Sequence, residues 1–151
     1  MIGPPVLADP VPRVLAWLEE HPQMVAALGG AGRVGARNEP PYPRLRVLDV
    51  PGGDDRDLRW LSATQMQIEA WGDMDGSPGK AELRRILYLA LGVLTELPEQ
   101  DGDPVITAVT SAQAGGWSPD PSGQPRYVAA VRVWAHPRPP AQPLEELTAP
   151  T

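Results

Sequence analysis

The glycines of Gly30-Ala31-Gly32-Arg33-Val34-Gly35 have the spacing of a dinucleotide-binding loop. In such a loop the glycines follow a strand and open a helix, whose N-terminus then faces the pyrophosphate. Here they follow a predicted helix and precede a predicted strand. The context is therefore reversed, and we interpret the glycines as a helix stop followed by a turn.

Two acidic groups offer carboxylates for metal binding or for acid–base chemistry. Asp73-Met74-Asp75-Gly76 matches the start of a calcium loop, but Ser77 and Arg84 occupy the later ligand positions. This pattern favours a turn and a helix cap over a metal site. The second group lies in a glycine-containing stretch, where solvation favours ordinary carboxylates over catalytic ones; its members are Asp54, Asp55 and Asp57.

Histidines, serines and cysteines give little support for an enzyme. His21 and His136 are far apart and have no ligand spacing, no serine lies in a G-x-S-x-G motif, and there is no cysteine. No nucleophile–base pair is visible, although a triad assembled only by the fold stays open. We expect no catalytic residue, no cofactor and no bound metal.

Tryptophan and arginine are the side chains that most often anchor protein interfaces. We predict that Trp71, Trp117, Trp134, Arg126 and Arg132 are exposed and form a candidate interface. The alternative is that the tryptophans lie in the core or cover a sheet face.

Composition limits the classes of protein that fit. The chain has 151 residues, 42% of them hydrophobic, which predicts one domain with one core. A net charge of −6 provides no basic footprint for duplex nucleic acid. No apolar run approaches the ~20 residues of a membrane span, and we expect no secretory leader. The lack of cysteine is compatible with a reducing compartment.

The segment 124–137 has the clearest strand periodicity in the chain. Alternation predicts a core face and a second, mixed face that carries Arg126, Arg132 and Trp134. The expected core face consists of Tyr127, Ala129, Val131, Val133 and Ala135.

Periodicity and turn residues predict two main helices and four further strands. The first helix begins after Asp9 and is interrupted at Pro22; the second is capped by Ser77 and ends at Pro98. We expect the other strands over 32–38, 44–50, 61–71 and 105–113, and loops over 51–57, 99–103 and 114–123. Acidic residues in the first two loops are Asp54, Asp55, Asp57, Glu99, Asp101 and Asp103.

These elements predict an α+β fold. Its sheet of about five strands is antiparallel or mixed, two helices pack on it, and the order is α-β-β-β-α-β-β. We expect a flexible N-terminus over 1–8, a single domain over 9–137 and a proline-rich disordered tail over 138–151.

In their order, several short motifs resemble the tail terminator proteins of long-tailed actinobacterial phages. The resemblance spans about residues 9–137. It includes the long helix, the Val-rich fourth strand, the loop with Trp117 and the Tyr127–Trp134 strand, together with Arg33-Val34-Gly35-Ala36-Arg37, Leu45-Arg46-Val47 and Gly52-Gly53-Asp54-Asp55.

This resemblance implies a non-enzymatic virion subunit that forms a ring, a hexamer in the family, at the head-proximal end of the tail tube. The implied partners are other copies of the chain, the tail tube protein and the head-completion protein. DNA would only pass through the lumen, no membrane would be involved, and assembly would take place in the host cytoplasm. The acidic loops are candidates for the lumen or the tube-facing surface, because a basic wall would bind phosphate.

Two other functions stay open. One is another neck or head–tail connector component. The other is a small bacterial regulatory or ligand-binding α+β domain.

Overall fold

The computed structural model describes residues 8–57 and 61–138, apart from the side chains of 55–57. The predicted flexible N-terminus and disordered tail therefore lie almost entirely outside the described residues. The helices are α1 (Val11–Glu20), α2 (Pro22–Leu28), α3 (Lys80–Leu94) and the short 3₁₀ helix η1 (Leu97–Glu99). The strands are β1 (Val34–Gly35), β2 (Arg44–Asp57), β3 (Leu61–Trp71), β4 (Val105–Trp117) and β5 (Arg126–His136).

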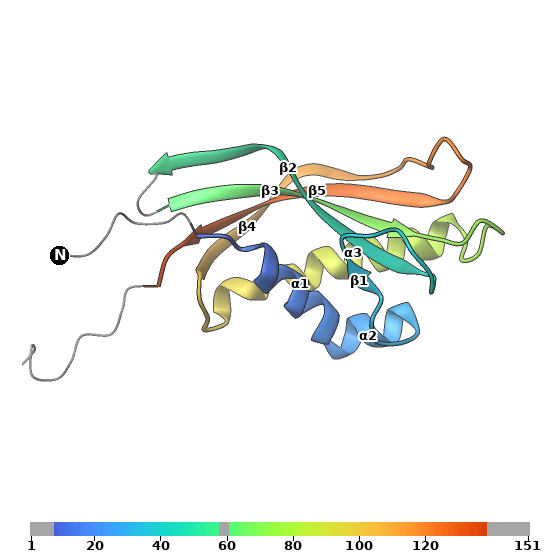
Figure 1. The fold of residues 1–151 in the computed structure, drawn as a ribbon, viewed down its shortest axis with the longest axis horizontal. Helices are drawn as coiled ribbons and strands as arrows, with labels where there is room; N and C mark the ends of the chain where they lie inside the picture. The colour runs from blue at the N-terminus through green and yellow to red at the C-terminus, as the bar shows by residue number, and fades with distance from the viewer. Residues whose placement is uncertain (1–7, 58–60, 139–151) are drawn as a thin grey trace, which may run out of the picture.

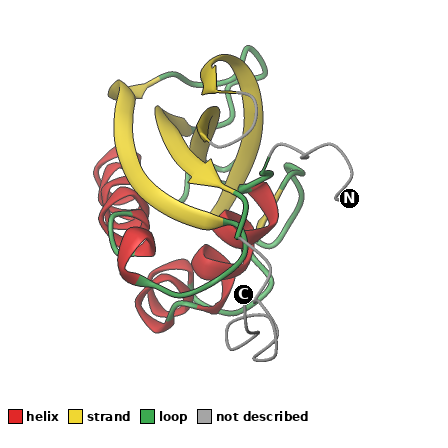
Figure 2. Cartoon of the chain, turned by 90° about the vertical axis from the view of Figure 1, so that its left-hand side faces the viewer, coloured by secondary structure: helices red, strands yellow, loops and turns green. Residues whose placement is uncertain are grey.

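The five strands form one mixed sheet in the order β1-β2-β3-β5-β4. β1 runs parallel to β2, and every other neighbouring pair is antiparallel. The helices pack on one face of the sheet (Figure 1), and the sheet itself is strongly curled (Figure 2). This is the predicted α+β fold, with β3 and β5 at the centre.

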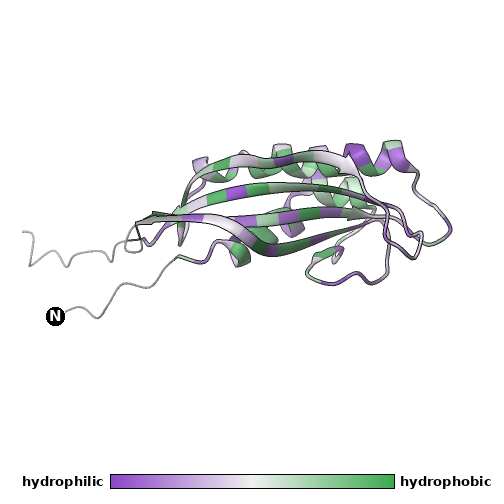
Figure 3. Ribbon diagram, turned by 90° about the horizontal axis from the view of Figure 1, so that it is seen from above, coloured by the Kyte–Doolittle hydropathy of each residue, from purple (hydrophilic) through white to green (hydrophobic). Residues whose placement is uncertain are grey.

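The core lies between the helices and one face of the central strands. All five residues of the predicted core face of β5 are buried, and Met66, Ile68 and Ala70 of β3 are buried beside them. From α3, the core receives Leu83, Ile86, Leu87, Ala90, Val93 and Leu94. Along the strands, hydrophobic and hydrophilic residues alternate, as a sheet with one covered face requires (Figure 3). Burying each large aliphatic side chain contributes roughly 1.5–3 kcal/mol.

β2 continues through the segment that was predicted to be a loop at 51–57. Its pairing with β3 shifts register between Val50 and Asp54 and again before Asp57. Gly52 has a φ of 116°, which favours glycine, and a Cβ on Gly53 would lie 2.1 Å from the carbonyl oxygen of Ala63. Glycines here bend a paired strand instead of ending it, so the loop prediction is wrong.

The first helix is interrupted at His21, as Pro22 predicts. His21 has an extended backbone, and Nδ1 of its ring accepts a hydrogen bond from the backbone N–H of Gln23 at 3.2 Å. Its Nε2 lies 3.1 Å from a carboxylate oxygen of Glu96. Since Nδ1 accepts, Nε2 must donate, and the neutral tautomer protonated on Nε2 satisfies both partners.

Several predicted boundaries of helices and strands differ from those in the structure. α3 is preceded by Gly79, not Ser77, and its N-cap has no side-chain hydrogen bond. β4 extends past residue 113 to Trp117, which shortens the final connection to residues 118–125. The strand predicted over 32–38 is reduced to β1, because only Val34 and Gly35 pair with β2.

Candidate functional site

The face of the sheet opposite the helices carries the polar and aromatic residues of the central strands. Register places Arg46 opposite Glu69, Arg126 opposite Trp71 and Arg132 opposite Gln65 on this face. No helix of the described chain packs on it (Figure 1). We call it the open face.

Glu69 is the centre of a charged cluster on the open face. Its side chain is 1% exposed, and its carboxylate lies 3.5 Å from Nη1 of Arg46 and 3.3 Å from Nη1 of Arg126. Gln67 Nε2 and Trp71 Nε1 also donate to it, at 2.6 and 3.0 Å. A buried carboxylate is tolerable only when it is paired and hydrogen-bonded. This one accepts three hydrogen bonds, from Arg126, Gln67 and Trp71, and forms a second ion pair with Arg46.

The prediction that Trp71 is exposed is wrong. The tryptophan is 2% exposed, and the guanidinium of Arg126 lies 5.2 Å from the centre of its ring. Such cation–π contacts favour an arginine held flat over the indole. Trp71 thus helps to hold the cluster in place.

Arg126 links the cluster to the loop between β4 and β5. Its Nε donates to the carbonyl oxygen of Ser118 at 2.8 Å, while Nη1 reaches Glu69. Further along the loop, hydrogen bonds from the side chain and the backbone N–H of Ser122 lower the pKa of Asp120. Arg126 is therefore a half-buried structural link with its remaining surface on the open face.

Gln124, in the same loop, has a role that the sequence did not indicate. Its side chain is buried, and Nε2 donates to the carbonyl oxygen of Gly72 at 2.8 Å while Oε1 accepts from Asn38 Nδ2 at 3.0 Å. Three loops are fastened together at this end of the sheet. Gln124 is the first residue of the predicted strand segment 124–137, and alternation along one strand does not show which loops its first side chain will contact.

Arg132 and Trp134 lie at the other end of the open face. Nε of Arg132 donates to the carbonyl oxygen of Gly52 at 3.1 Å, and Nε1 of Trp134 lies 3.3 Å from the hydroxyl oxygen of Thr110. Both side chains are only partly buried. Along β5 they are about 20 Å (Arg132) and about 26 Å (Trp134) away from Arg126, since a strand rises by roughly 3.3 Å per residue. The predicted interface residues are thus divided between two ends of one face.

Trp117, the last predicted interface residue, lies on the helix side of the sheet. It is 38% exposed, its ring contacts Tyr127, and Lys80 Nζ lies 5.6 Å from its centre. Its ring therefore packs on the helix side, while the residue also lines a hollow shared with Gln67 and Arg126.

The acidic residues lie at one end of the sheet. Asp54 belongs to the last part of β2, and the side chains of Asp55 and Asp57 are not described. Glu99, Asp101 and Asp103 are exposed just before β4 begins. Through the registers, Asp54 pairs with Ala63, Ala63 with Trp134 and Trp134 with Ala108, so the two acidic segments occupy the same end on opposite edges.

Arg13 holds the second acidic segment against α1. Its guanidinium donates to the carbonyl oxygens of Pro104, Asp101 and Gln100, at 2.7, 3.2 and 3.4 Å. Because these acceptors are backbone groups, the carboxylates of the segment stay exposed to solvent.

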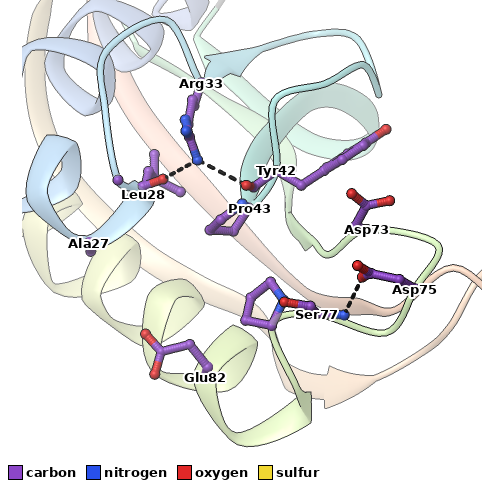
Figure 4. Close-up of a pocket in the computed structure, with 11 residues that line it drawn as sticks. Ala27, Leu28, Arg33, Tyr42, Pro43, Asp73, Asp75, Ser77 and Glu82 are labelled. Carbon is purple, nitrogen blue, oxygen red and sulfur yellow. Dashed lines mark hydrogen bonds between the residues drawn. The ribbon is translucent and has the colours of Figure 1, made fainter.

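A hollow of about 330 Å³ lies between the end of α2 and the start of α3 (Figure 4). Arg33 donates to the carbonyl oxygens of Leu28 and Tyr42 on one side of it, at 2.6 and 2.9 Å. The carboxylates of Asp73, Asp75 and Glu82 lie on the other side.

The residues of the two sequence motifs, the calcium-loop-like stretch 73–76 and the glycine motif 30–35, form structural hydrogen bonds. Asp73 and Asp75 accept from the backbone N–H groups of Met74 and Ser77, as in a turn. Arg33, in the glycine motif, closes the end of α2 through Leu28. Among the described residues, no three His, Cys, Asp or Glu side chains gather as a metal site would require, and no helix is long and apolar enough to cross a membrane.

Comparison with known proteins identifies a structural likeness only. No family model matches the chain, and no curated protein matches its sequence. A solved structure described as the virion of a native gene transfer agent (GTA) particle contains a similar chain, with a TM-score of 0.61 and 14% sequence identity. The likeness covers 82% of this chain and 91% of that chain. At this identity it shows a shared fold.

Proposed function

We propose that this chain is a structural subunit of a phage-like virion. The observation that carries the proposal is the likeness to a chain of a gene transfer agent particle over 82% of this chain and 91% of that one. The candidate site also supports a structural role, since the side chains of the described polar clusters form hydrogen bonds and ion pairs within the fold. Tryptophan and arginine on a sheet face without helices suit a protein that meets other proteins.

Within that class we propose a tail terminator. Copies of the chain form a ring, expected to be a hexamer, at the head-proximal end of the tail tube; the ring stops tube polymerisation and joins the tube to the head-completion protein. A closed ring needs two different complementary surfaces on each subunit. The open face and the two unlike edges of the sheet supply surfaces of this kind, and the sequence motifs resemble the family in the same order.

Electron microscopy of the purified protein, alone and mixed with tail tubes, tests the proposal. We expect closed rings, and tubes that carry a ring at one end and stop growing. Rings that bind the head connector but leave tube growth unchanged would favour another neck component. A monomer at every concentration that also fails to bind tubes would contradict the ring and favour a small bacterial domain.

A further inference from the structure

β4 is an outer strand whose free edge lacks the usual chemical protection. It pairs with β5 on one side, and no strand of the described chain lies on the other. Its thirteen residues, VITAVTSAQAGGW, include no charged residue and no proline. Edge strands normally carry charges, prolines or bulges that discourage pairing with a second chain.

Of the features that discourage pairing with a second chain, β4 has only bulges, and these are not spread evenly along the strand. Pairing with β5 shifts register between Ile106 and Ala108, and twice more between Ser111 and Gly116. From Ala108 to Ser111 the register is regular. An added strand would therefore find a regularly paired, uncharged stretch of edge at residues 108–111.

A second free edge lies on the opposite side of the sheet. β1 pairs only with Leu45 and Arg46, so in the described chain no strand covers β2 from Val47 onward on that side. Pro51 and the register shifts after Val50 confine the regular part of this edge to Val47–Val50. This part of β2 lies level with the regular part of β4, because the registers connect Val50 through Gln65 and Arg132 to Thr110.

Strand direction makes the two edges compatible in a ring. β2 is antiparallel to β3, β3 to β5 and β5 to β4, so β4 and β2 run in opposite directions. Cyclic symmetry keeps every copy in the same orientation. The β4 edge of one copy would then meet the β2 edge of the next as an antiparallel pair.

We infer that the free edge of β4, around residues 108–111, binds the regular part of the uncovered β2 edge, around Val47–Val50, in a second copy of this chain. The backbone groups of both strands then pair, and the sheet continues from one copy to the next. This inference rests on the proposed ring and names its subunit contact. Arg132 and Trp134 flank the contact on the open face through Gly52 and Thr110.

The cysteine-free sequence allows a direct test with the full-length chain. Ser111 and Asp49 are exposed, one on each edge, and each is replaced by cysteine. Under mild oxidation the double variant S111C/D49C should give a ladder of linked oligomers up to the closed ring. A mixture of the two single variants should give linked dimers, and each single variant alone should give none. The free edges do not determine which residue of β2 lies opposite Ser111. P51C is therefore tested as a second partner for S111C.

Three results would overturn the inference. Linked dimers from S111C alone would mean that β4 pairs with β4 about a twofold axis. Rings seen by electron microscopy that yield no crosslinks from either cysteine pair would place the contact elsewhere and leave the ring itself standing. A chain that stays monomeric at all concentrations would overturn both the contact and the ring.

A charge variant gives an independent readout that does not depend on disulfide geometry. Thr107→Lys with Ser111→Lys places charges on the free edge, and Ala16→Lys with Ala26→Lys places the same charges on exposed helix positions. The edge variant should lose rings by sedimentation while its circular dichroism stays that of the parent, and the helix variant should keep them. Rings that persist at parental yield in the edge variant would contradict the contact.

Discussion

The charged cluster around Glu69 shows how a single residue can be misread from sequence. Alternation along β3 places Glu69 on the face away from the core, and it does lie there. Burial comes from two arginines on the neighbouring strands and from Trp71, and their meeting depends on register across three strands. One strand read by itself contains no information about that register.

We predict that Glu69→Gln destabilises the fold by about 3–5 kcal/mol, because removing one partner leaves buried or half-buried guanidinium groups without their counter-charge. Chemical denaturation at neutral pH measures the change. Glu99→Gln, on an exposed carboxylate, is the matched control and should stay within about 0.5 kcal/mol of the parent. Equal effects of the two substitutions would mean that the cluster adds nothing to stability.

Asp120 predicts a dependence of stability on pH. Hydrogen bonds from Ser122 lower the pKa of Asp120 in the folded chain. A lowered pKa contributes stability that is present above the ordinary carboxyl pKa and is lost as the pH falls through the folded value. The stability difference between the parent and Asp120→Asn should therefore narrow as the pH is lowered from 7 into the acid range. Denaturation curves over that range check it, and a difference that does not change with pH would contradict the assignment.

Among the elements, the central strands and α3 could be predicted most completely. β3 has the predicted bounds, and the predicted core residues of β5 are all buried, because a strand with one covered face must alternate. β2 and β4 were predicted too short, because Gly52-Gly53 and Gly115-Gly116 are typical of turns. In the folded chain these glycines lie at bulges, which depend on the partner strand and not on local propensity.

Gly53 provides a test of the bulged part of β2. Gly53→Ala would place a Cβ 2.1 Å from the carbonyl oxygen of Ala63, so the strands must move apart or the backbone must bend. We expect a loss of stability of about 1–3 kcal/mol, the usual range for overpacking. Gly92→Ala is the control, since a Cβ there meets nothing within 4 Å on the exposed side of α3. It should raise stability by about 0.5–1 kcal/mol. Thermal melts of both variants measure these changes in stability. A Gly53→Ala variant as stable as the parent would contradict the bulge.

At the scale of the whole molecule, the open face makes Arg132 a test of subunit or partner contact. Arg132→Glu reverses a charge that is only partly buried and whose described bond is to a backbone carbonyl. We expect a folded chain that forms rings or binds tubes poorly. Circular dichroism checks that the chain is folded, and electron microscopy measures ring formation and tube binding. Normal assembly of a folded Arg132→Glu protein would move the contact away from this end of the face.

The exposed acidic segment before β4 belongs to the same scale, because its proposed role exists only in an assembled tail. Replacing Glu99, Asp101 and Asp103 by their amides removes three exposed charges without touching the backbone carbonyls that Arg13 binds. We expect unchanged stability and altered tube docking or DNA ejection in particles that carry the variant. Unchanged infectivity would contradict a role in the lumen or against the tube.

Both ends of the described chain leave the domain at one end of the sheet, where β2 ends and β4 begins (Figure 1). A fluorescent domain joined directly at Ala8 or at Arg138 would therefore crowd that end. The opposite end, with the loops at 36–43, 72–78 and 118–125, would stay sterically open. Such a fusion reports the orientation of the subunit. If it blocks binding of one partner while the other partner still binds, the blocked partner contacts the end of the sheet that carries the fusion.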